Sequence, residues 1–218
     1  MLNTLTTILP LDFASTLSPV IFALAIILLS THPPQKVNLT AFFIGTLSVG
    51  IIATYFGFHI GQEINPDKGK GDLSAIIDII LGVVFLFFAF KSLVTKDKPF
   101  KQKKSAQSSK FLKWLSIGFI INATNFDALF LNLTAARIVG RAHTIPLALK
   151  YVLLCLNLIF LTLPITLPVV LYLLFPVTAS KVLSKINEFL LKYSRYIIAV
   201  LFFILGFFFL KNGLVYFI

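Results

Sequence analysis

The chain consists almost entirely of long apolar runs separated by short polar connections. The runs cover about residues 8–30, 39–60, 73–94, 111–135, 146–175 and 196–217. Each run is apolar on all sides, whereas the helices of a soluble bundle would carry polar faces at helical spacing. About twenty apolar residues in a helix cross the roughly 30 Å of hydrocarbon in a bilayer. The sequence therefore predicts an all-α integral membrane protein with six transmembrane helices.

The composition agrees with a membrane protein. Hydrophobic residues make up 58% of the chain and charged residues 12%, whereas roughly a quarter of a soluble protein is charged. The net charge of +11 comes mainly from Lys and Arg in the connections, where such residues set orientation, so we expect no nucleic-acid partner. The lone Cys155 lies within an apolar run and has no second cysteine for an internal disulfide.

The distribution of basic residues predicts an orientation. No Lys or Arg precedes the first run and no small-residue cleavage site follows it, so we count it as a span and not as a signal peptide. Six spans place both termini on one side, which holds 6 Lys and Arg residues against 13 on the other. Because cytoplasmic loops carry the basic excess, we expect both termini outside and the Lys-rich loop 96–110 in the cytoplasm, in the inner (plasma) membrane.

The two halves of the chain echo each other. Ser-Pro-Val at 18–20 lies inside the first run, and Asn-Phe-Asp at 125–127 lies at a comparable depth in the fourth. Ile-Leu-Gly occurs at 80–82 in the third run and again at 204–206 in the sixth. Because each half has three spans, a repeat of this kind would be inverted across the bilayer, which is a common plan of transporters.

This pattern predicts three parts of the chain. Residues 1–95 form the first three-helix repeat, 96–110 form the Lys-rich cytoplasmic loop, and 111–218 form the second repeat. Within the second repeat, residues 177–193 place apolar side chains on one side and lysines elsewhere. That arrangement predicts a short helix lying in the membrane interface.

The fourth run contains the densest group of polar residues. Asn122, Thr124, Asn125, Asp127 and Asn132 fall within eleven residues of a predicted span. In lipid such groups need a partner or water, so they predict the wall of a cavity. The alternative is hydrogen bonding between helices that only holds the bundle together. Asp127 is also a candidate for coupling export to the proton gradient.

Prolines mark the first and fifth runs. Pro19 frees a backbone carbonyl near residue 15, and Ser15 or Ser18 can satisfy it, although a simple kink explains the motif equally well. Pro164 and Pro168 would kink or unwind the fifth run, as a hinge or as a static bend. The predicted substrate-binding residues are therefore Ser15, Ser18, Pro19, Asn122, Asn125, Asp127 and Pro168.

The remaining ionisable residues give little sign of catalysis. We expect Asp12 at the outer interface, and Asp78 either there or within the membrane. His59 and Glu63 are one turn apart, which favours a surface contact over a metal site. The sequence has no zinc-type cluster, no phosphate-binding glycine loop and no recognisable catalytic grouping. We therefore expect no enzyme activity, no cofactor and no metal.

Several short motifs resemble the GAP family of the LysE transporter superfamily. They occur in order at residues 17–19, 42–46, 121–127, 167–172 and 205–214, so the likeness covers essentially the whole chain. Members of that family include sulfolipid-addressing proteins of mycobacteria, which are implicated in moving glycolipids. The resemblance implies six spans, two three-span repeats and membrane export.

The chain departs from its relatives at two places. The fourth helix of the family usually carries an Asn-Pro pair, whereas Asn125 is followed here by Phe126. Thiol-transferring members of the superfamily carry paired cysteines on the first and fourth helices. Ser18 and Asn125 stand near those places, which argues against electron transfer.

Two functions follow as expectations. The first is a secondary transporter or exporter that moves a small solute or lipid by alternating access between the two repeats. The alternative is a non-transporting scaffold or accessory subunit of an envelope or lipid export system, with the Lys-rich loop as a docking segment or a grip on anionic lipids. The expected partners are the lipid bilayer, the solute or lipid substrate, and a second copy of the chain in a possible homodimer. A transporter needs a polar cavity with Asn125 and Asp127 in its wall, whereas a scaffold should be packed solid there.

Overall fold

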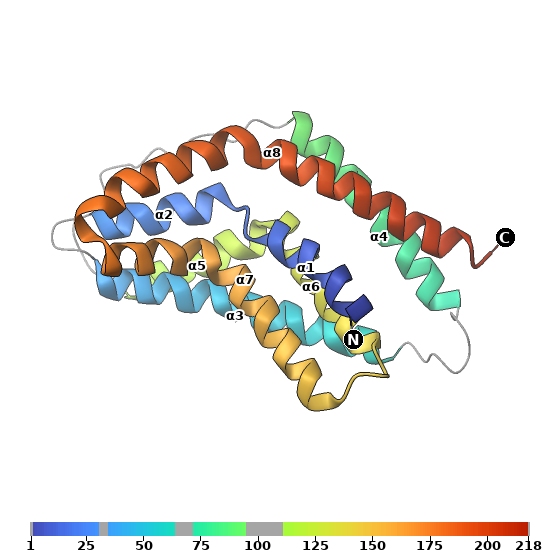
Figure 1. Cartoon of the computed structure of the whole chain (residues 1–218). Coiled ribbons are helices and arrows are strands. Elements are labelled where there is room, and N and C mark those ends of the chain that lie inside the picture. Colours follow the sequence, from blue (N-terminus) through green and yellow to red (C-terminus); the bar gives the residue numbers. More distant parts are fainter. Residues whose placement is uncertain (1, 31–34, 64–71, 95–110, 218) are drawn as a thin grey trace.

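The computed structural model describes residues 2–30, 35–63, 72–94 and 111–217. The predicted Lys-rich loop 96–110 lies outside these residues. Helices account for nearly all of the described chain, and they follow one another as α1 (Leu2–Ser15), α2 (Pro19–Ser30), α3 (Lys36–Gln62), α4 (Asp72–Val94), α5 (Phe111–Thr124), α6 (Phe126–Arg141), α7 (Leu147–Leu174) and α8 (Pro176–Leu214) (Figure 1).

Apolar helices of membrane-spanning length dominate the fold. Four helices, α3, α4, α7 and α8, are long and apolar enough to cross a bilayer alone. Two bent pairs pass the same test together: α1 with α2, bent by 55°, and α5 with α6, bent by 75°. Counting each pair as one span gives up to six spans. The predicted all-helical architecture is confirmed for the described residues, and its apolar helices are compatible with a multi-pass membrane protein.

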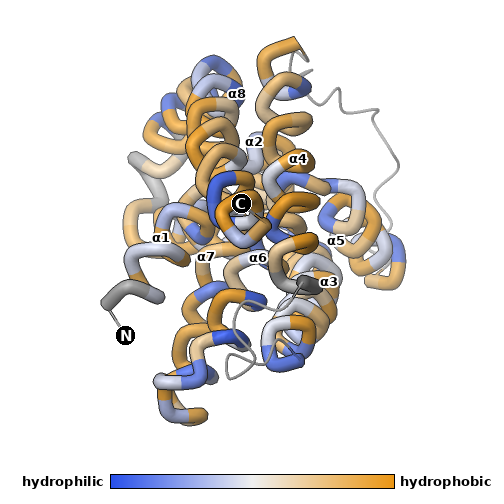
Figure 2. Tube along the Cα trace, turned by 90° about the vertical axis from the view of Figure 1, so that its right-hand side faces the viewer, coloured by the Kyte–Doolittle hydropathy of each residue, from blue (hydrophilic) through white to orange (hydrophobic). Residues whose placement is uncertain are grey.

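The outer surface is rich in large apolar side chains. Large apolar side chains such as Phe13, Phe87 and Phe207 are more than half exposed. Figure 2 looks along the bundle and shows hydrophobic residues in all of the helices, with hydrophilic residues interspersed among them. An apolar exterior of this extent would be unstable in water but matches a hydrocarbon solvent.

The structure divides two of the predicted runs. The first run is interrupted between α1 and α2, where Pro19 begins the second helix. The fourth run is interrupted at Asn125, although no proline follows it. Proline therefore explains only one of the two breaks.

Two other runs are continuous where the sequence suggested interruption. Helix α7 contains Pro164 and Pro168 without a break, so neither proline unwinds it. Helix α8 has 39 residues and continues through 177–193 into the last span. No Gly or Pro lies between residues 177 and 205, so nothing ends the helix there. The interfacial position of 177–193 stays a prediction, but this segment is not a separate helix.

Close backbone contacts hold the helices in two groups. Helix α3 packs along α5 and α6, and α4 packs along α8 (Figure 1). Glycines allow the first contact: a Cβ at Gly118 would lie 2.2 Å from the Phe42 carbonyl oxygen, and one at Gly140 equally close to that of Phe58. Small residues serve the same purpose in many membrane helix pairs.

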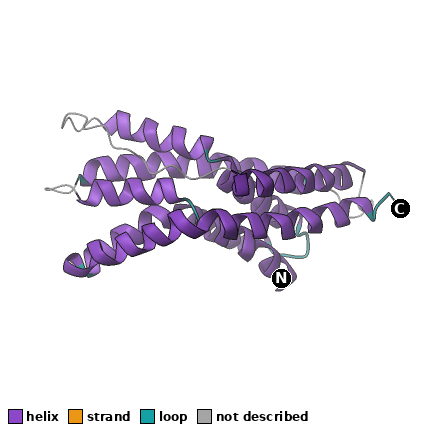
Figure 3. Ribbon diagram, turned by 90° about the horizontal axis from the view of Figure 1, so that it is seen from above, coloured by secondary structure: helices purple, strands orange, loops and turns teal. Residues whose placement is uncertain are grey.

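Both termini lie at the same end of the bundle in Figures 1 and 3. An even number of crossings requires this arrangement, and it agrees with six spans. The side of the membrane on which the termini lie stays a prediction.

Candidate functional site

The two helix breaks meet inside the bundle. The Asn125 side-chain amide donates a hydrogen bond of 3.1 Å to the Ser18 hydroxyl. Ser18 directly precedes α2, and Asn125 directly precedes α6. One polar contact therefore joins two breaks that lie 107 residues apart in sequence.

The chain breaks at these points for different local reasons. Pro19 has no N–H to donate to the turn before it, which favours an interruption of the helix at this point. At the second break, Asn125 adopts φ −81° and ψ 66°, which is outside the helical region. Asparagine tolerates such conformations because its short amide side chain can hydrogen-bond locally.

A cavity of about 340 Å³ opens at the joined breaks. Its wall comes from α1, α2, α4, α5, α6 and α8, together with the residues of the two breaks. The lining residues are Ala14, Leu17, Ser18, Pro19, Val20, Lys91, Ser92, Ile121, Thr124, Asn125, Asp127, Ala128, Leu131, Arg195 and Ile198.

The charges around this cavity favour an anion. Lys91 and Arg195 are two cations on its wall against the single carboxylate of Asp127. Helices α2 and α6 both begin at the cavity, and a helix N-terminus carries partial positive charge and free N–H groups. The Arg195 Nε atom is buried and has no hydrogen-bond partner among the described residues. The cavity can therefore accommodate an anionic group beside its apolar lining.

Four of the seven predicted site residues line this cavity: Ser18, Pro19, Asn125 and Asp127. These four residues could be predicted from the sequence, because a proline and a cluster of polar residues interrupt two of its apolar runs. Lys91 and Arg195 were missed as site residues, because in sequence they look like basic residues that set orientation. Only the packing of α4 and α8 brings them to the breaks.

The other three predicted site residues do not line this cavity. The Ser15 hydroxyl donates to the Asp12 carbonyl oxygen at 2.7 Å within its own helix. The Asn122 amide donates to the Thr46 carbonyl oxygen at 2.9 Å and so ties α5 to α3. Pro168 is buried inside α7. Contact of these three residues with a substrate stays a prediction that the cavity does not support.

Asn132 has a packing role as well. The Asn132 side-chain amide donates to the Asn157 side-chain oxygen, and the Asn157 amide donates to the Asn132 backbone carbonyl oxygen at 3.1 Å, so the two residues join α6 to α7. Thr54 on α3 donates to the Asn132 side-chain oxygen at 3.2 Å. The polar group of the fourth run therefore serves both uses that the sequence allowed: part of it lines the cavity and part of it joins helices.

Two aspartates are buried. Asp12 is 1% exposed, so its expected place at the outer interface is wrong, and neither carboxylate oxygen has a partner among the described residues. It lies on the face of α1 that packs against the rest of the bundle. Asp78 is 3% exposed and contacts Arg137 of α6.

His59 lies on the surface, as predicted, but no side-chain hydrogen bond or ion pair with Glu63 is found among the described residues. Its ring is exposed and lies 4.3 Å from the Tyr55 ring, centroid to centroid, on α3. No group of three or more His, Cys, Asp or Glu residues that could hold a metal occurs in the described ranges.

The chain matches the model of one protein family. The family model of Sap, the sulfolipid-1-addressing protein, matches residues 8–215. The chain belongs to this family. The match covers both halves of this chain and both of its helix breaks. It confirms the resemblance to sulfolipid-addressing proteins. No curated protein and no solved structure matches it.

Proposed function

We propose that this Sap-family protein is a secondary exporter that moves an amphiphile or small solute with an anionic group by alternating access. The observation that carries the proposal is the cavity of about 340 Å³ at the joined helix breaks, with Lys91 and Arg195 in its wall. Transporters commonly bind their substrates where spanning helices break and free backbone groups are available.

The lining suggests the chemistry of the substrate. The cationic residues and helix N-termini suit a sulfate, phosphate or carboxylate group. The apolar side chains of Leu17, Ile121 and Ile198 in the same wall suit the hydrocarbon part of an amphiphile. The family name points to a lipid, which fits this combination of charge and apolar surface.

Two contacts support an inverted repeat of LysE type. In the predicted repeat, Ser18 and Asn125 would occupy equivalent positions, and they are hydrogen-bonded. Gly82 and Gly206 would also be equivalent: a Cβ at Gly82 would lie 2.9 Å from the Gly206 oxygen, and one at Gly206 would lie 3.1 Å from the Gly82 oxygen. A two-fold axis between the halves would bring such equivalent residues together, and rocking of one repeat against the other would then open the cavity to alternate sides.

The cavity also favours transport over a scaffold function. A non-transporting scaffold should be packed solid around Asn125 and Asp127, whereas both residues line an open space. Coupling to protons through Asp127 stays a prediction.

Accessibility of single cysteines tests the proposal. Cysteines at Ser18, Asn125 and Asp127 would be placed in a Cys155→Ala background and exposed to a membrane-impermeant maleimide from each side. Asn122→Cys is the matched control, because Asn122 lies one turn from Asn125 but is fully buried and bonded to α3.

We expect the three cavity positions to react from either side, with the favoured side changing when an anionic lipid is added. Asn122→Cys should stay unreactive. Reaction from one side only under all conditions would contradict alternating access, and absence of reaction at all three positions would contradict the cavity itself.

A further inference from the structure

A second cavity, of about 230 Å³, lies on four of the helices that form the first. Helices α1, α4, α6 and α8 contribute to both. The second cavity is lined by Thr4, Thr7, Asp78, Arg137, Ile138, Arg141, Ala142, Phe208, Phe209 and Asn212. Neither Arg137 nor Arg141 was a predicted site residue.

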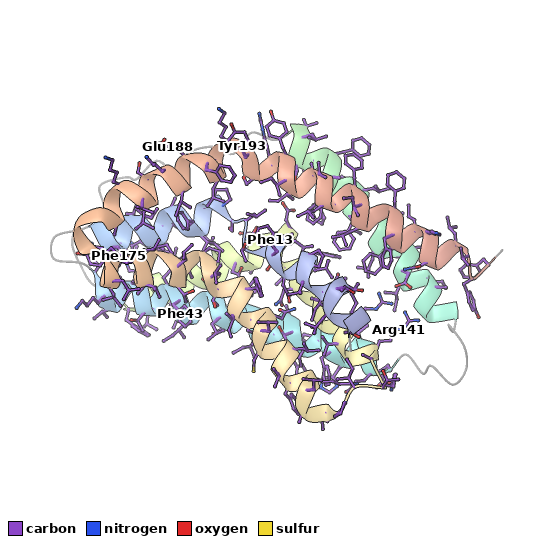
Figure 4. The ribbon with its side chains drawn as sticks, in the orientation of Figure 1. Phe13, Phe43, Arg141, Phe175, Glu188 and Tyr193 are labelled. Carbon is purple, nitrogen blue, oxygen red and sulfur yellow. The ribbon has the colours of Figure 1, made fainter. Side chains whose placement is uncertain are left out.

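The two cavities are displaced along these helices in the same direction. On α4, Asp78 of the second cavity precedes Lys91 of the first by 13 residues, which corresponds to about 20 Å of helix. On α6, Arg141 follows Asp127 by 14 residues, or about 21 Å. The second cavity therefore lies toward the end of the bundle where both termini are found (Figure 1). Arg141 marks this end in Figure 4.

Aromatic side chains separate the two cavities. The Phe85 ring lies 5.5 Å from that of Phe202 and 5.6 Å from that of Phe209, centroid to centroid. Phe88 contacts Phe202 at 6.0 Å and Phe130 at 5.8 Å. This cluster belongs to the main apolar core between α4, α6 and α8, so a continuous polar path between the cavities is closed in this conformation.

The second cavity contains an incomplete ion cluster. An Arg137 nitrogen lies 2.9 Å from one oxygen of Asp78, and an Arg141 nitrogen lies 3.7 Å from the other. Arg137 is 3% exposed, yet its Nε and Nη2 atoms have no hydrogen-bond partner within the described ranges. Two guanidinium groups thus share one carboxylate, and a buried cation without full compensation is costly.

We propose that this second cavity binds an oxyanion, such as a sulfate, phosphate or carboxylate group, on Arg137 and Arg141. An oxyanion would accept hydrogen bonds from the two free nitrogens of Arg137 and neutralise the excess positive charge of the cluster. Phe208 and Phe209 would contact any apolar part of the same ligand. The proposal that this cavity is a second binding site for the transported molecule rests on the proposed function. The proposal that it binds an oxyanion does not.

The competing explanation is that Arg137 and Asp78 only hold α6 to α4. The substitution Asp78→Asn distinguishes the two explanations, because they predict different effects on phosphate binding. If the cavity binds oxyanions, loss of the carboxylate raises the net charge of the cluster, and the affinity for inorganic phosphate should rise about tenfold. If the pair is only structural, Asp78→Asn lowers the unfolding midpoint and phosphate does not restore it.

The experiment measures the thermal unfolding of the full-length protein in a neutral detergent while inorganic phosphate is titrated at constant ionic strength. A ligand at concentration c that binds only the folded state stabilises it by RT ln(1 + c/Kd), so the midpoint rises with the logarithm of the phosphate concentration once this exceeds the dissociation constant. The paired variant Asp78→Asn/Arg137→Gln removes Arg137 without leaving an unpaired carboxylate in the cluster. In this variant, the rise of the unfolding midpoint that is due to phosphate at this site should be lost. A phosphate response that is identical in the wild type, Asp78→Asn and the paired variant would overturn the proposal.

A second arm identifies the source of the oxyanion. Lysophosphatidic acid and the zwitterionic lysophosphatidylcholine would be compared with inorganic phosphate. Tighter Arg137-dependent binding of lysophosphatidic acid assigns the site to a lipid headgroup, whereas equal affinities assign it to a free anion; either supports an oxyanion site. None of these variants touches the first cavity, so the cysteine test above can fail while this one succeeds.

Discussion

Asn125 and Ser18 form a polar contact in the wall of the central cavity. Each side chain comes from a break between two helices, where backbone groups lack their helical partners. Measured hydrogen bonds between membrane helices nevertheless contribute modestly, because the unfolded chain in the membrane also finds partners.

A double-mutant cycle measures this contact. We expect Ser18→Ala and Asn125→Ala to be coupled by about 0.5–2 kcal/mol in the free energy of unfolding, measured by denaturation in mixed micelles. Thr124→Ala is the control, because Thr124 is next to Asn125 but its hydroxyl bonds only to carbonyls of its own helix. A coupling of zero with Ser18, or an equal coupling for Thr124, would show that the contact does not stabilise the protein.

Substitution of Asp12 is expected to increase the free energy of unfolding. Its carboxyl group is buried and has no hydrogen-bond partner in the described part of the chain, which costs free energy. We expect Asp12→Leu to raise the free energy of unfolding by about 1–3 kcal/mol, as measured by the same denaturation. Leu11→Ala, one residue earlier and fully buried, should lower it and serves as the control. Destabilisation by Asp12→Leu would mean that the carboxyl group has a stabilising partner.

The sequence predicted cavity residues well where a polar side chain directly adjoined a helix break, as at Ser18 and Asn125. It was less informative for Asn122, since a polar residue in a span reads the same whether it lines a cavity or bonds to a neighbouring backbone. It could not predict the exposure of Asp12, because burial depends on which face of α1 meets the other helices.

At the scale of the helices, α4 and α8 pack along each other. Their backbones approach at Gly82 and Gly206, which the sequence had marked only as an echo between the two halves. The pairing itself could not be read from the chain, because it joins segments more than one hundred residues apart.

Substituting Gly82 tests this contact. A Cβ at Gly82 would lie 2.8 Å from the backbone nitrogen of Leu210, so Gly82→Ala must push α8 away. We expect a loss of about 1–3 kcal/mol in the free energy of unfolding. The neighbouring Val83→Ala changes a side chain that is 55% exposed to lipid and should alter it by less than about 0.5 kcal/mol. Equal effects at the two positions would argue against the close approach.

The helix breaks were only half predictable. Pro19 gave a local cause for the first, whereas the second occurs at Asn125, which is followed by Phe126 and not by a proline. The continuity of α7 through two prolines is the converse case. Proline content alone is thus a poor guide to where a membrane helix is interrupted, because neighbouring helices can satisfy the freed carbonyl groups.

For the whole molecule, six spans and the distribution of basic residues predict that both termini face outward. Epitope tags at the N- and C-termini should both be digested by an impermeant protease added to intact spheroplasts, while a tag inserted at residue 104 should be protected. Termini on opposite sides would contradict an even number of spans. Protection of both termini would reverse the orientation and leave the span number intact.

The all-helical fold could be predicted because runs of apolar residues record it directly, and the structure has four candidate spans, or up to six if each bent pair is one span. The relation between the halves could be predicted only as an echo, because contacts such as those of Ser18 with Asn125 or Gly82 with Gly206 arise after folding. The ion cluster of the second cavity escaped prediction entirely, since Asp78 and Arg137 lie 59 residues apart.

The separation of the two cavities along the bundle has an electrical consequence. An anion that moves about 20 Å from the first to the second carries its charge through much of the membrane's electric field. A cell interior that is negative by about 100 mV favours outward movement of one negative charge by about 2.3 kcal/mol for a full crossing, and by roughly two-thirds of that over about 20 Å of the roughly 30 Å. With the termini outside, the resting membrane voltage alone would power export of an anionic molecule, and each transport cycle would register as a current.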